Sequence, residues 1–244
     1  MAVPKPTVTI IFDVDGVILD SPHEQAWRAA LAGFADPARF TTAFYQRVVA
    51  GKPRADGALA ALTELGVLNA AARSIDYARQ KQALMETLIA AGSFTVYPDA
   101  LRAVQRFAAA GYALAVASSS KNAQAMLARI TAGPGRTLAA MFSVSVCGRD
   151  LPRGKPDPAI FLLAAAEADA EPGTCLVVED APAGILAAKA GGMAALGIAR
   201  HDDAAPLRLA GADLVLADLD ALADDAVPTL IEAARERKHH ADRV

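Results

Sequence analysis

The chain has 244 residues, of which 54% are hydrophobic and 21% are charged, and its formal net charge is -3. This length suits one large α/β domain, with or without a small inserted one, and the composition is that of a compact globular protein. The slightly negative net charge argues against nucleic acid or an anionic membrane as the main partner, so an anionic substrate would need local cations.

The cysteines and the apolar runs indicate the compartment. Cys147 and Cys175 lie in apolar runs typical of buried strands and lack zinc-ligand spacing, so buried thiols are more probable there than a disulfide. No apolar run approaches the length of a bilayer span, and none before the first expected strand is long enough for a signal peptide. We therefore expect a cytoplasmic protein that is a monomer or a weak homodimer.

The first expected element is a buried strand that begins near Val8 and ends at Asp13, Asp15 and Gly16. Residues i and i+2 of a strand point to the same side, so the two carboxylates can converge on one small volume. Ionised carboxylates beside apolar packing need compensating charge, which indicates a metal site, a proton-transfer role or both. Considered alone, Asp-x-Asp-Gly is more often a simple strand-ending turn.

A predicted helical block of about 70 residues follows this strand, because apolar residues recur there at helical spacing with few β-branched runs. Such a block can hold a small core of its own. We therefore predict a core domain, residues 1–20 and 95–244, and an inserted helical domain, residues 21–94.

Strands and helices alternate from residue 96 onward. A helix is expected to begin at Lys121, directly after the three serines at positions 118–120. The other expected elements are helices over residues 98–109, 158–168 and 183–190 and strands over residues 113–117, 144–147, 175–178, 194–198 and 213–216. Such alternation predicts an α/β fold with a doubly wound parallel sheet and right-handed crossovers. Ligands bind such sheets at the carboxyl ends of the strands.

Polar residues follow several of these strands. Ser118 opens a helix after the second strand of the sheet, Glu179 and Asp180 follow a later strand, and Lys155 lies in a loop before the helix at residue 158. Acids suit a divalent cation, and a hydroxyl with helix-start N–H groups suits phosphate oxygens. Taken singly, Ser118 could be a plain helix cap and Lys155 an exposed loop lysine.

Four segments resemble, in order, the four motifs of the haloacid dehalogenase (HAD) superfamily of phosphotransferases. They are residues 12–17, 117–120, 154–156 and 178–181. The helical block after the first motif is similar to the small α-helical cap of that superfamily. The resemblance covers nearly the whole chain, and four motifs in order are far more specific than any one of them.

The resemblance implies Mg²⁺-dependent phosphoryl transfer through an aspartyl phosphate. Asp13 would be the nucleophile, and Asp15 would be the general acid and base. Mg²⁺ would be held by the Asp13 carboxylate, the Asp15 backbone carbonyl and Asp180, with Glu179 close by.

The same resemblance implies that Ser118 and Lys155 bind the oxygens of the transferring phosphoryl group. It also separates two branches of the superfamily, because the dehalogenases need no metal and lack the second aspartate, here Asp15. We therefore expect a phosphoryl-transfer enzyme.

Within the superfamily, the helical block resembles the cap of β-phosphoglucomutase and of related sugar-phosphate hydrolases. The resemblance implies that Arg54 holds the phosphate that is not transferred, that Lys81 faces the sugar and that His23 hydrogen-bonds near the general acid. The other substrate-binding residues that it implies are Gly51, Ser120, Lys121 and Asn122.

The acceptor of the phosphoryl group stays open. A mutase and a phosphatase share the aspartyl phosphate, and a closed cap that excludes water yields a mutase. The cap residues favour the mutase, whereas the segment from Asp20 to His23, which is shorter than in the mutase, favours the hydrolase. Gly57 also stands where a serine is expected. In both cases we expect a small phosphorylated sugar as the substrate.

A protein without catalytic activity that binds a sugar phosphate or a partner protein is the contrasting hypothesis. Its mark would be a missing nucleophile, acid or metal carboxylate, and this chain has all of them.

Overall fold

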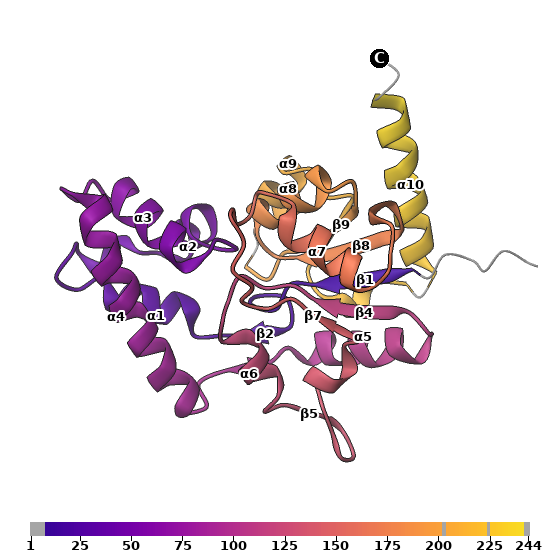
Figure 1. Ribbon diagram of the computed structural model, residues 1–244, viewed down its shortest axis with the longest axis horizontal. Helices are drawn as coiled ribbons and strands as arrows, with labels where there is room; N and C mark the ends of the chain where they lie inside the picture. The colour runs from indigo at the N-terminus through magenta and orange to yellow at the C-terminus, as the bar shows by residue number, and fades with distance from the viewer. Residues whose placement is uncertain (1–7, 202–203, 224, 242–244) are drawn as a thin grey trace, which may run out of the picture.

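The computed structural model describes residues 8–201, 204–223 and 225–241. The outermost residues of the predicted core domain, 1–7 and 242–244, lie outside the described residues. A six-stranded sheet forms the centre of the larger part of the molecule, and a group of helices lies to one side of it (Figure 1). In spatial order the strands are β10 (Leu214–Leu216), β9 (Ala194–Ile198), β8 (Cys175–Glu179), β1 (Thr9–Phe12), β4 (Ala113–Val116) and β7 (Val144–Ser145).

The strands of this sheet run parallel to one another. The strand β1 pairs with β4 on one side and with β8 on the other, and Phe12 lies level with both Val116 and Val178. The carboxyl ends of these three strands therefore meet at one edge of the sheet. This arrangement confirms the predicted α/β fold with a doubly wound parallel sheet.

The side chains of β1 alternate between two hydrophobic clusters, one on each face of the sheet. Ile10 and Phe12 pack in the first cluster, and Ile11 packs in the second. Because both faces are covered, β1 is apolar throughout rather than alternately polar. The first cluster includes side chains of α5 (Pro98–Ala109), α6 (Ala123–Leu127) and α10 (Ala226–Ala241), together with Ala26 and Met85 from two helices of the cap. Those of the second are α7 (Ala159–Glu167), α8 (Pro182–Ala190) and α9 (Ala204–Leu209).

A third hydrophobic cluster, which contains Trp27, Leu62 and Tyr77, lies inside the helical cap. The cap helices are α1 (His23–Ala30), α2 (Thr42–Val48), α3 (Arg54–Glu64) and α4 (Ala70–Ala90). The chain enters and leaves the cap through an antiparallel pair of short strands, β2 (Leu19–Asp20) and β3 (Thr95–Val96). The predicted insertion after the first strand is therefore confirmed, whereas the exact limits of two domains remain a prediction.

The remaining elements are short, and two predicted elements differ from the structure by two residues at one end, whereas the others differ by at most one residue at either end. The short elements are β5 (Thr131–Gly133), β6 (Arg136–Thr137) and the 3-10 helices η1 (Pro37–Arg39), η2 (Ala139–Met141), η3 (Pro172–Thr174) and η4 (Leu219–Ala221). The strand predicted over residues 144–147 ends at Ser145, because β7 pairs with β4 over two residues only. The helix expected to open at Lys121 begins at Ala123, since the Ser120 hydroxyl accepts the Asn122 N–H in a local turn (3.2 Å).

Both cysteines are free thiols. Cys175 is buried in β8 as expected, whereas Cys147 follows β7 and is partly exposed. Burial raises the pKa of both thiols to about 11, so neither is a reactive thiolate at neutral pH. None of the helices in the described part of the chain combines the length and the apolar composition of a bilayer-crossing segment.

Candidate active site

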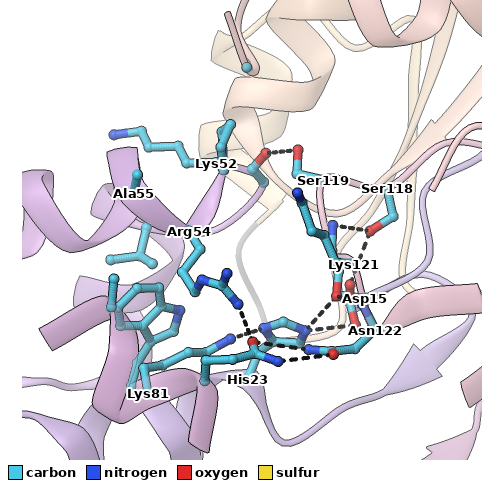
Figure 2. A pocket seen from close by; sticks show the side chains of 18 of the residues that line it. Asp15, His23, Lys52, Arg54, Ala55, Lys81, Ser118, Ser119, Lys121 and Asn122 are labelled. Atoms are coloured by element: carbon cyan, nitrogen blue, oxygen red, sulfur yellow. Dashed lines mark hydrogen bonds and ion pairs between the residues drawn. The ribbon is translucent and has the colours of Figure 1, made fainter. Parts of the chain in front are cut away.

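A cavity of about 750 Å³ lies between the carboxyl ends of the central strands and the cap. Figure 2 shows side chains of both parts converging on it. The predicted site residues that line it from the core are Asp13, Asp15, Ser118, Ser120, Lys121, Asn122 and Asp180. Those that line it from the cap are His23, Gly51, Arg54 and Lys81. The structure thus brings together residues that lie far apart in the sequence, at the edge where parallel sheets bind ligands.

The turn after β1 places the acids. The N–H of Asp13 donates to the carbonyl of Val178 (2.9 Å), which extends the β1–β8 ladder to the acid itself. Gly16 then has a φ of +90°, and a side chain on it would overlap the Asp180 carboxylate. Only glycine therefore allows both this turn and the approach of Asp180 to it.

Lys155 is the buried cation of the site. It is 2% exposed, and its ammonium group donates to Asp13 Oδ1 (2.6 Å) and to Glu179. Burial lowers the pKa of Lys155, but the two carboxylates outweigh burial and hold that pKa above its ordinary value. Lys155 is therefore a buried ammonium group in contact with Asp13, the predicted nucleophile.

Asp13 experiences opposing effects. Burial, with the charges of Glu179 and Asp15, raises the pKa of Asp13 to about 7, although the Lys155 ammonium group opposes this shift. A bound divalent cation would favour the ionised form of this carboxylate.

Glu179 is fully buried, and both of its carboxylate oxygens accept hydrogen bonds from protein groups. One of its oxygens accepts from Lys155, and the other accepts the Ala181 N–H (2.8 Å). Its proximity to Mg²⁺ remains a prediction, and the structure favours a role in holding Lys155 beside Asp13. The sequence places Glu179 near the site, but local patterns do not indicate which partner it takes.

The donor atoms around Asp13 fit Mg²⁺. No group of three His, Cys, Asp or Glu side chains among the described residues is arranged to hold a metal by itself. The predicted set, however, needs only the Asp13 and Asp180 carboxylates and the Asp15 backbone carbonyl, and Mg²⁺ commonly takes one or two carboxylates and keeps several waters. The turn at Gly16 lets the Asp180 carboxylate approach closely, and Asp13, Asp15 and Asp180 all line the same cavity.

The loop after β4 supplies hydroxyl groups. Ser118, which is buried, donates to Asp15 Oδ2 (3.2 Å) and accepts the Ser120 N–H (3.0 Å). The neighbouring Ser119 donates to the carbonyl of Gly51 in the cap (3.2 Å). Ser118 is therefore more than a helix cap, because it touches the predicted general acid.

His23 links the cap to Asp15, the predicted general acid (Figure 2). Its Nδ1 lies 2.7 Å from Lys81 Nζ, and its Nε2 lies 3.2 Å from Ser120 Oγ and 3.4 Å from Asp15 Oδ1. Burial, then the charge of Lys81, lowers the pKa of His23 to about 4, although Asp15 opposes this. The imidazole is therefore neutral at pH 7. Because Lys81 donates to Nδ1, the Nε2 atom carries the proton and faces Asp15 and Ser120.

Arg54 reaches the core through a residue that the sequence did not suggest. Its guanidinium donates to Gln82, and the Gln82 amide donates to Asn122 Oδ1 (3.2 Å). Lys121 is held at the cavity rim by an ion pair with Asp150 (2.6 Å). Gln82 lies one residue after Lys81 on a polar face of α4, and this position is the only sequence signal that could have indicated it.

Tyr45 of α2 is a further cavity residue that sequence analysis missed. Burial holds its pKa well above the ordinary value, and the charges of Asp15 and Asp180 add to this shift. A phenol near these carboxylates therefore stays protonated and can donate a hydrogen bond into the cavity. Its position in an amphipathic helix gave no signal beyond core packing.

Comparisons with known proteins agree with this geometry. Residues 7–192 match the model of the haloacid dehalogenase-like hydrolase family. A β-phosphoglucomutase of Mycobacterium bovis is 31% identical over 244 aligned positions, which cover 90% of this chain and 92% of that protein. A validoxylamine A 7′-phosphate phosphatase of Streptomyces hygroscopicus subsp. limoneus is 30% identical and covers 86% of this chain and 92% of its own.

A solved structure is similar over nearly the whole fold. The β-phosphoglucomutase of the archaeon Pyrococcus sp. strain ST 04 superposes with a TM-score of 0.73 at 29% identity. The match covers 92% of this chain and 99% of that one, so it includes both the sheet and the cap.

Proposed function

The chain belongs to the haloacid dehalogenase-like hydrolase family and is an enzyme, and we propose that it transfers the phosphoryl group of a small sugar phosphate through an aspartyl phosphate. The observation that carries this proposal is the meeting of Asp13, Asp15, Ser118 and Lys155 at the carboxyl ends of three adjacent strands. The cap closes over them with further cationic side chains, as an anionic substrate requires.

Asp13 is the nucleophile of the proposed reaction. One of its oxygens forms a bond to phosphorus while the bond from phosphorus to the ester oxygen breaks, which divides a difficult displacement into two easier ones. Lys155 and Ser118 bind the equatorial phosphoryl oxygens and stabilise their charge. A Mg²⁺ ion held by Asp13, Asp180 and the Asp15 carbonyl would supply positive charge that shields the carboxylate from the phosphate.

Asp15 is the general acid and base. It gives a proton to the leaving ester oxygen and later takes one from the acceptor of the phosphoryl group. Ser118 binds its Oδ2, and the protonated Nε2 of His23 faces its Oδ1, so both oxygens have an oriented neighbour. This arrangement keeps Asp15 directed into the cavity.

The cap supports a phosphorylated sugar as the substrate. Arg54 and Lys81 place positive charge opposite the core acids, and Gln82 and Asn122 add amide groups that suit hydroxyls. One relative is named a β-phosphoglucomutase and another a validoxylamine A 7′-phosphate phosphatase, which supports a small phosphate ester as the substrate of the present chain.

The seating of the cap favours the mutase over the phosphatase. The Gly51 carbonyl accepts from Ser119 of the core, and Pro53 lies against Gly154. We expect a cap seated in this way to exclude water from the aspartyl phosphate, which would make a sugar hydroxyl the preferred acceptor.

The chemistry is tested by Asp13→Asn. An amide cannot form the acyl phosphate at a useful rate, so we expect phosphoryl transfer to fall by about three orders of magnitude or more. Asp56→Asn, which changes an exposed aspartate of α3 outside the cavity, is the matched control and should keep full activity. Retained transfer in Asp13→Asn would refute the proposed intermediate.

The acceptor is tested by ³¹P NMR of the Mg²⁺-loaded protein with β-glucose 1-phosphate and a trace of glucose 1,6-bisphosphate. We expect glucose 6-phosphate to grow without inorganic phosphate. Growth of inorganic phosphate instead would identify a phosphatase. If neither product forms, this hexose phosphate is not the substrate, and a panel of other sugar phosphates is the next probe.

A further inference from the structure

Arg200, which follows β9, reaches across the sheet edge to the turn behind Asp15. Its Nη2 donates to the carbonyl of Val17 (2.9 Å), and its Nε donates to the carbonyl of Gly16 (3.3 Å). The Arg200 side chain is nearly buried. One guanidinium therefore holds two successive carbonyls of the segment that starts at the general acid.

The same guanidinium is fixed from the other side by the chain that leaves the cap. Its Nη1 donates to both carboxylate oxygens of Asp99 (2.9 and 3.0 Å), and it lies 3.9 Å above the ring of Tyr97. Tyr97 directly follows β3, and its N–H donates to the carbonyl of Ile18 (2.9 Å). Asp99 also accepts the N–H of Leu219 (2.8 Å), which orients its carboxylate.

The turn itself cannot satisfy these carbonyls. Its internal hydrogen bonds run from the N–H of Gly16 to the carbonyl of Leu19 (2.8 Å) and from the N–H groups of Ile18 and Leu19 to the carbonyl of Val14 (2.9 and 2.8 Å). The carbonyls of Gly16 and Val17 are left for Arg200, and Val17 is fully buried. Without the guanidinium, the turn would have to rearrange to give those carbonyls other partners.

We propose that Arg200 is a positioning residue for the phosphoryl transfer, which holds the turn after Asp15 against the cap connection and thereby keeps the Asp15 side chain directed at the leaving oxygen. The guanidinium of Arg200 is held by the carbonyls of the turn and by Asp99, and Arg200 does not line the cavity, so it acts through Asp15 and not on the substrate. This inference rests on the function proposed above.

The nucleophile is anchored independently of Arg200. Asp13 is held by the β1–β8 ladder through Val178 and by the Lys155 ammonium group. Loss of Arg200 should therefore impair proton donation to the leaving group more than attack on phosphorus. That selectivity distinguishes positioning from a general loss of structure.

The test compares two phosphate esters by kcat/KM, which reports the steps up to formation of the aspartyl phosphate. The leaving group of p-nitrophenyl phosphate departs without protonation, whereas the alkoxide of a sugar phosphate needs a proton. We expect Arg200→Met to lower kcat/KM for the sugar phosphate at least about 10-fold more than for p-nitrophenyl phosphate, because general acid catalysis contributes about 10²- to 10⁴-fold. Asp15→Asn should show the same selectivity to a larger extent.

Further variants keep the test valid if Arg200→Met folds poorly. Arg200→Lys keeps the charge but lacks the fork that binds two carbonyls and Asp99 together, so it should show a smaller loss with the same selectivity. Asp99→Asn weakens the anchor of the guanidinium and should behave in the same way. Arg102→Met, which changes an exposed arginine of α5 paired with Asp220, is the matched control and should affect neither ester.

The outcomes separate the two proposals. Equal losses on both esters in a folded Arg200 variant, or no loss on either, would overturn the positioning role while leaving the proposed function intact. If Asp15→Asn itself shows no preference between the esters, the proposed function fails, and the role of Arg200 fails with it.

Discussion

Lys81 is an unusual charged residue because it is 2% exposed and has no carboxylate at hydrogen-bond distance among the described residues that contact it. Its ammonium group donates to the neutral imidazole of His23 and lies 5.1 Å from the centre of the Trp27 ring. Burial lowers its pKa to about 7, against the opposing charge of Asp15 and with a smaller contribution from the charge of Arg54. Without substrate, the site therefore holds a lysine that is easily deprotonated, and an arriving phosphate would favour its charged form.

The stability of the protein should depend on pH through Lys81. Its pKa is about 7 in the folded state and 10.5 ordinarily, so the unfolded chain binds more protons between these values. The resulting destabilisation is complete below pH 7 and is relieved as the pH rises toward 10.5. The free energy of unfolding of the wild type, relative to Lys81→Met, should therefore rise from pH 7 to pH 10 by up to about 1.4 kcal/mol per pH unit.

Urea unfolding of both proteins at several pH values measures this difference. Lys81→Arg is the control, because a guanidinium stays charged over the whole range and cannot gain stability by losing a proton. A difference between wild type and Lys81→Met that is constant from pH 7 to pH 10 would contradict the assignment.

At the scale of elements, the loop between α2 and α3 forms a contact between the cap and the core. Pro53 of this loop packs so closely on Gly154 that a methyl group on Gly154 would overlap its ring. Gly154 does not have the left-handed backbone that would itself require glycine, so the constraint comes from the cap alone. The hydrogen bond from the Ser119 hydroxyl to the Gly51 carbonyl (3.2 Å) joins the core to the same loop of the cap.

Gly154→Ala should therefore hold the cap away from the core. Overpacking of this kind costs about 1–3 kcal/mol, which corresponds to about a 5- to 150-fold rise in the KM of the sugar phosphate. We also expect more turnovers to end in inorganic phosphate, because a displaced cap admits water. Steady-state kinetics and ³¹P NMR measure the two effects.

Gly173→Ala is the matched control, because a methyl group there meets only ordinary contacts with the Arg235 side chain. It should leave both the KM and the products unchanged. If Gly154→Ala also leaves them unchanged, the contact between Pro53 and Gly154 does not limit closure of the cap.

At the scale of the whole molecule, Ala26 and Met85 of the cap belong to a cluster of the sheet, while most buried side chains of the cap form a hydrophobic cluster of their own. The single tryptophan, Trp27, lies in this cluster, so its fluorescence reports the order of the cap. Leu62→Ala removes a fully buried side chain from the same cluster, which costs about 2–5 kcal/mol. We expect the fluorescence transition of this variant to occur at a lower denaturant concentration than the loss of far-UV circular dichroism, most of which reports the rest of the protein.

Leu207→Ala, which removes a fully buried leucine of α9 from a cluster of the sheet, is the comparison. It should not move the fluorescence transition ahead of the circular dichroism transition. Coincident transitions in Leu62→Ala would show that cap and core unfold as one unit, which would contradict the predicted division into two domains.

The sequence by itself determined the α/β fold, the insertion of the cap and the residues at the strand ends. These features depend on local patterns: an apolar run marks a buried strand, and the polar residues that end it must lie at the edge of the sheet. Asp13, Ser118 and Asp180 follow strands that are neighbours in the sheet, so chain order and topology were enough to bring them to one cavity.

Only the tertiary structure decided which partners these residues take. Glu179 binds Lys155, Lys81 binds His23, and Arg200 binds Gly16 across 184 positions of the sequence. A buried polar group must find its partner wherever the packed chain places one, and no local pattern records a contact over such a distance. For the same reason the contact between cap and core, on which we propose that the choice of phosphoryl acceptor depends, became visible only in the folded molecule.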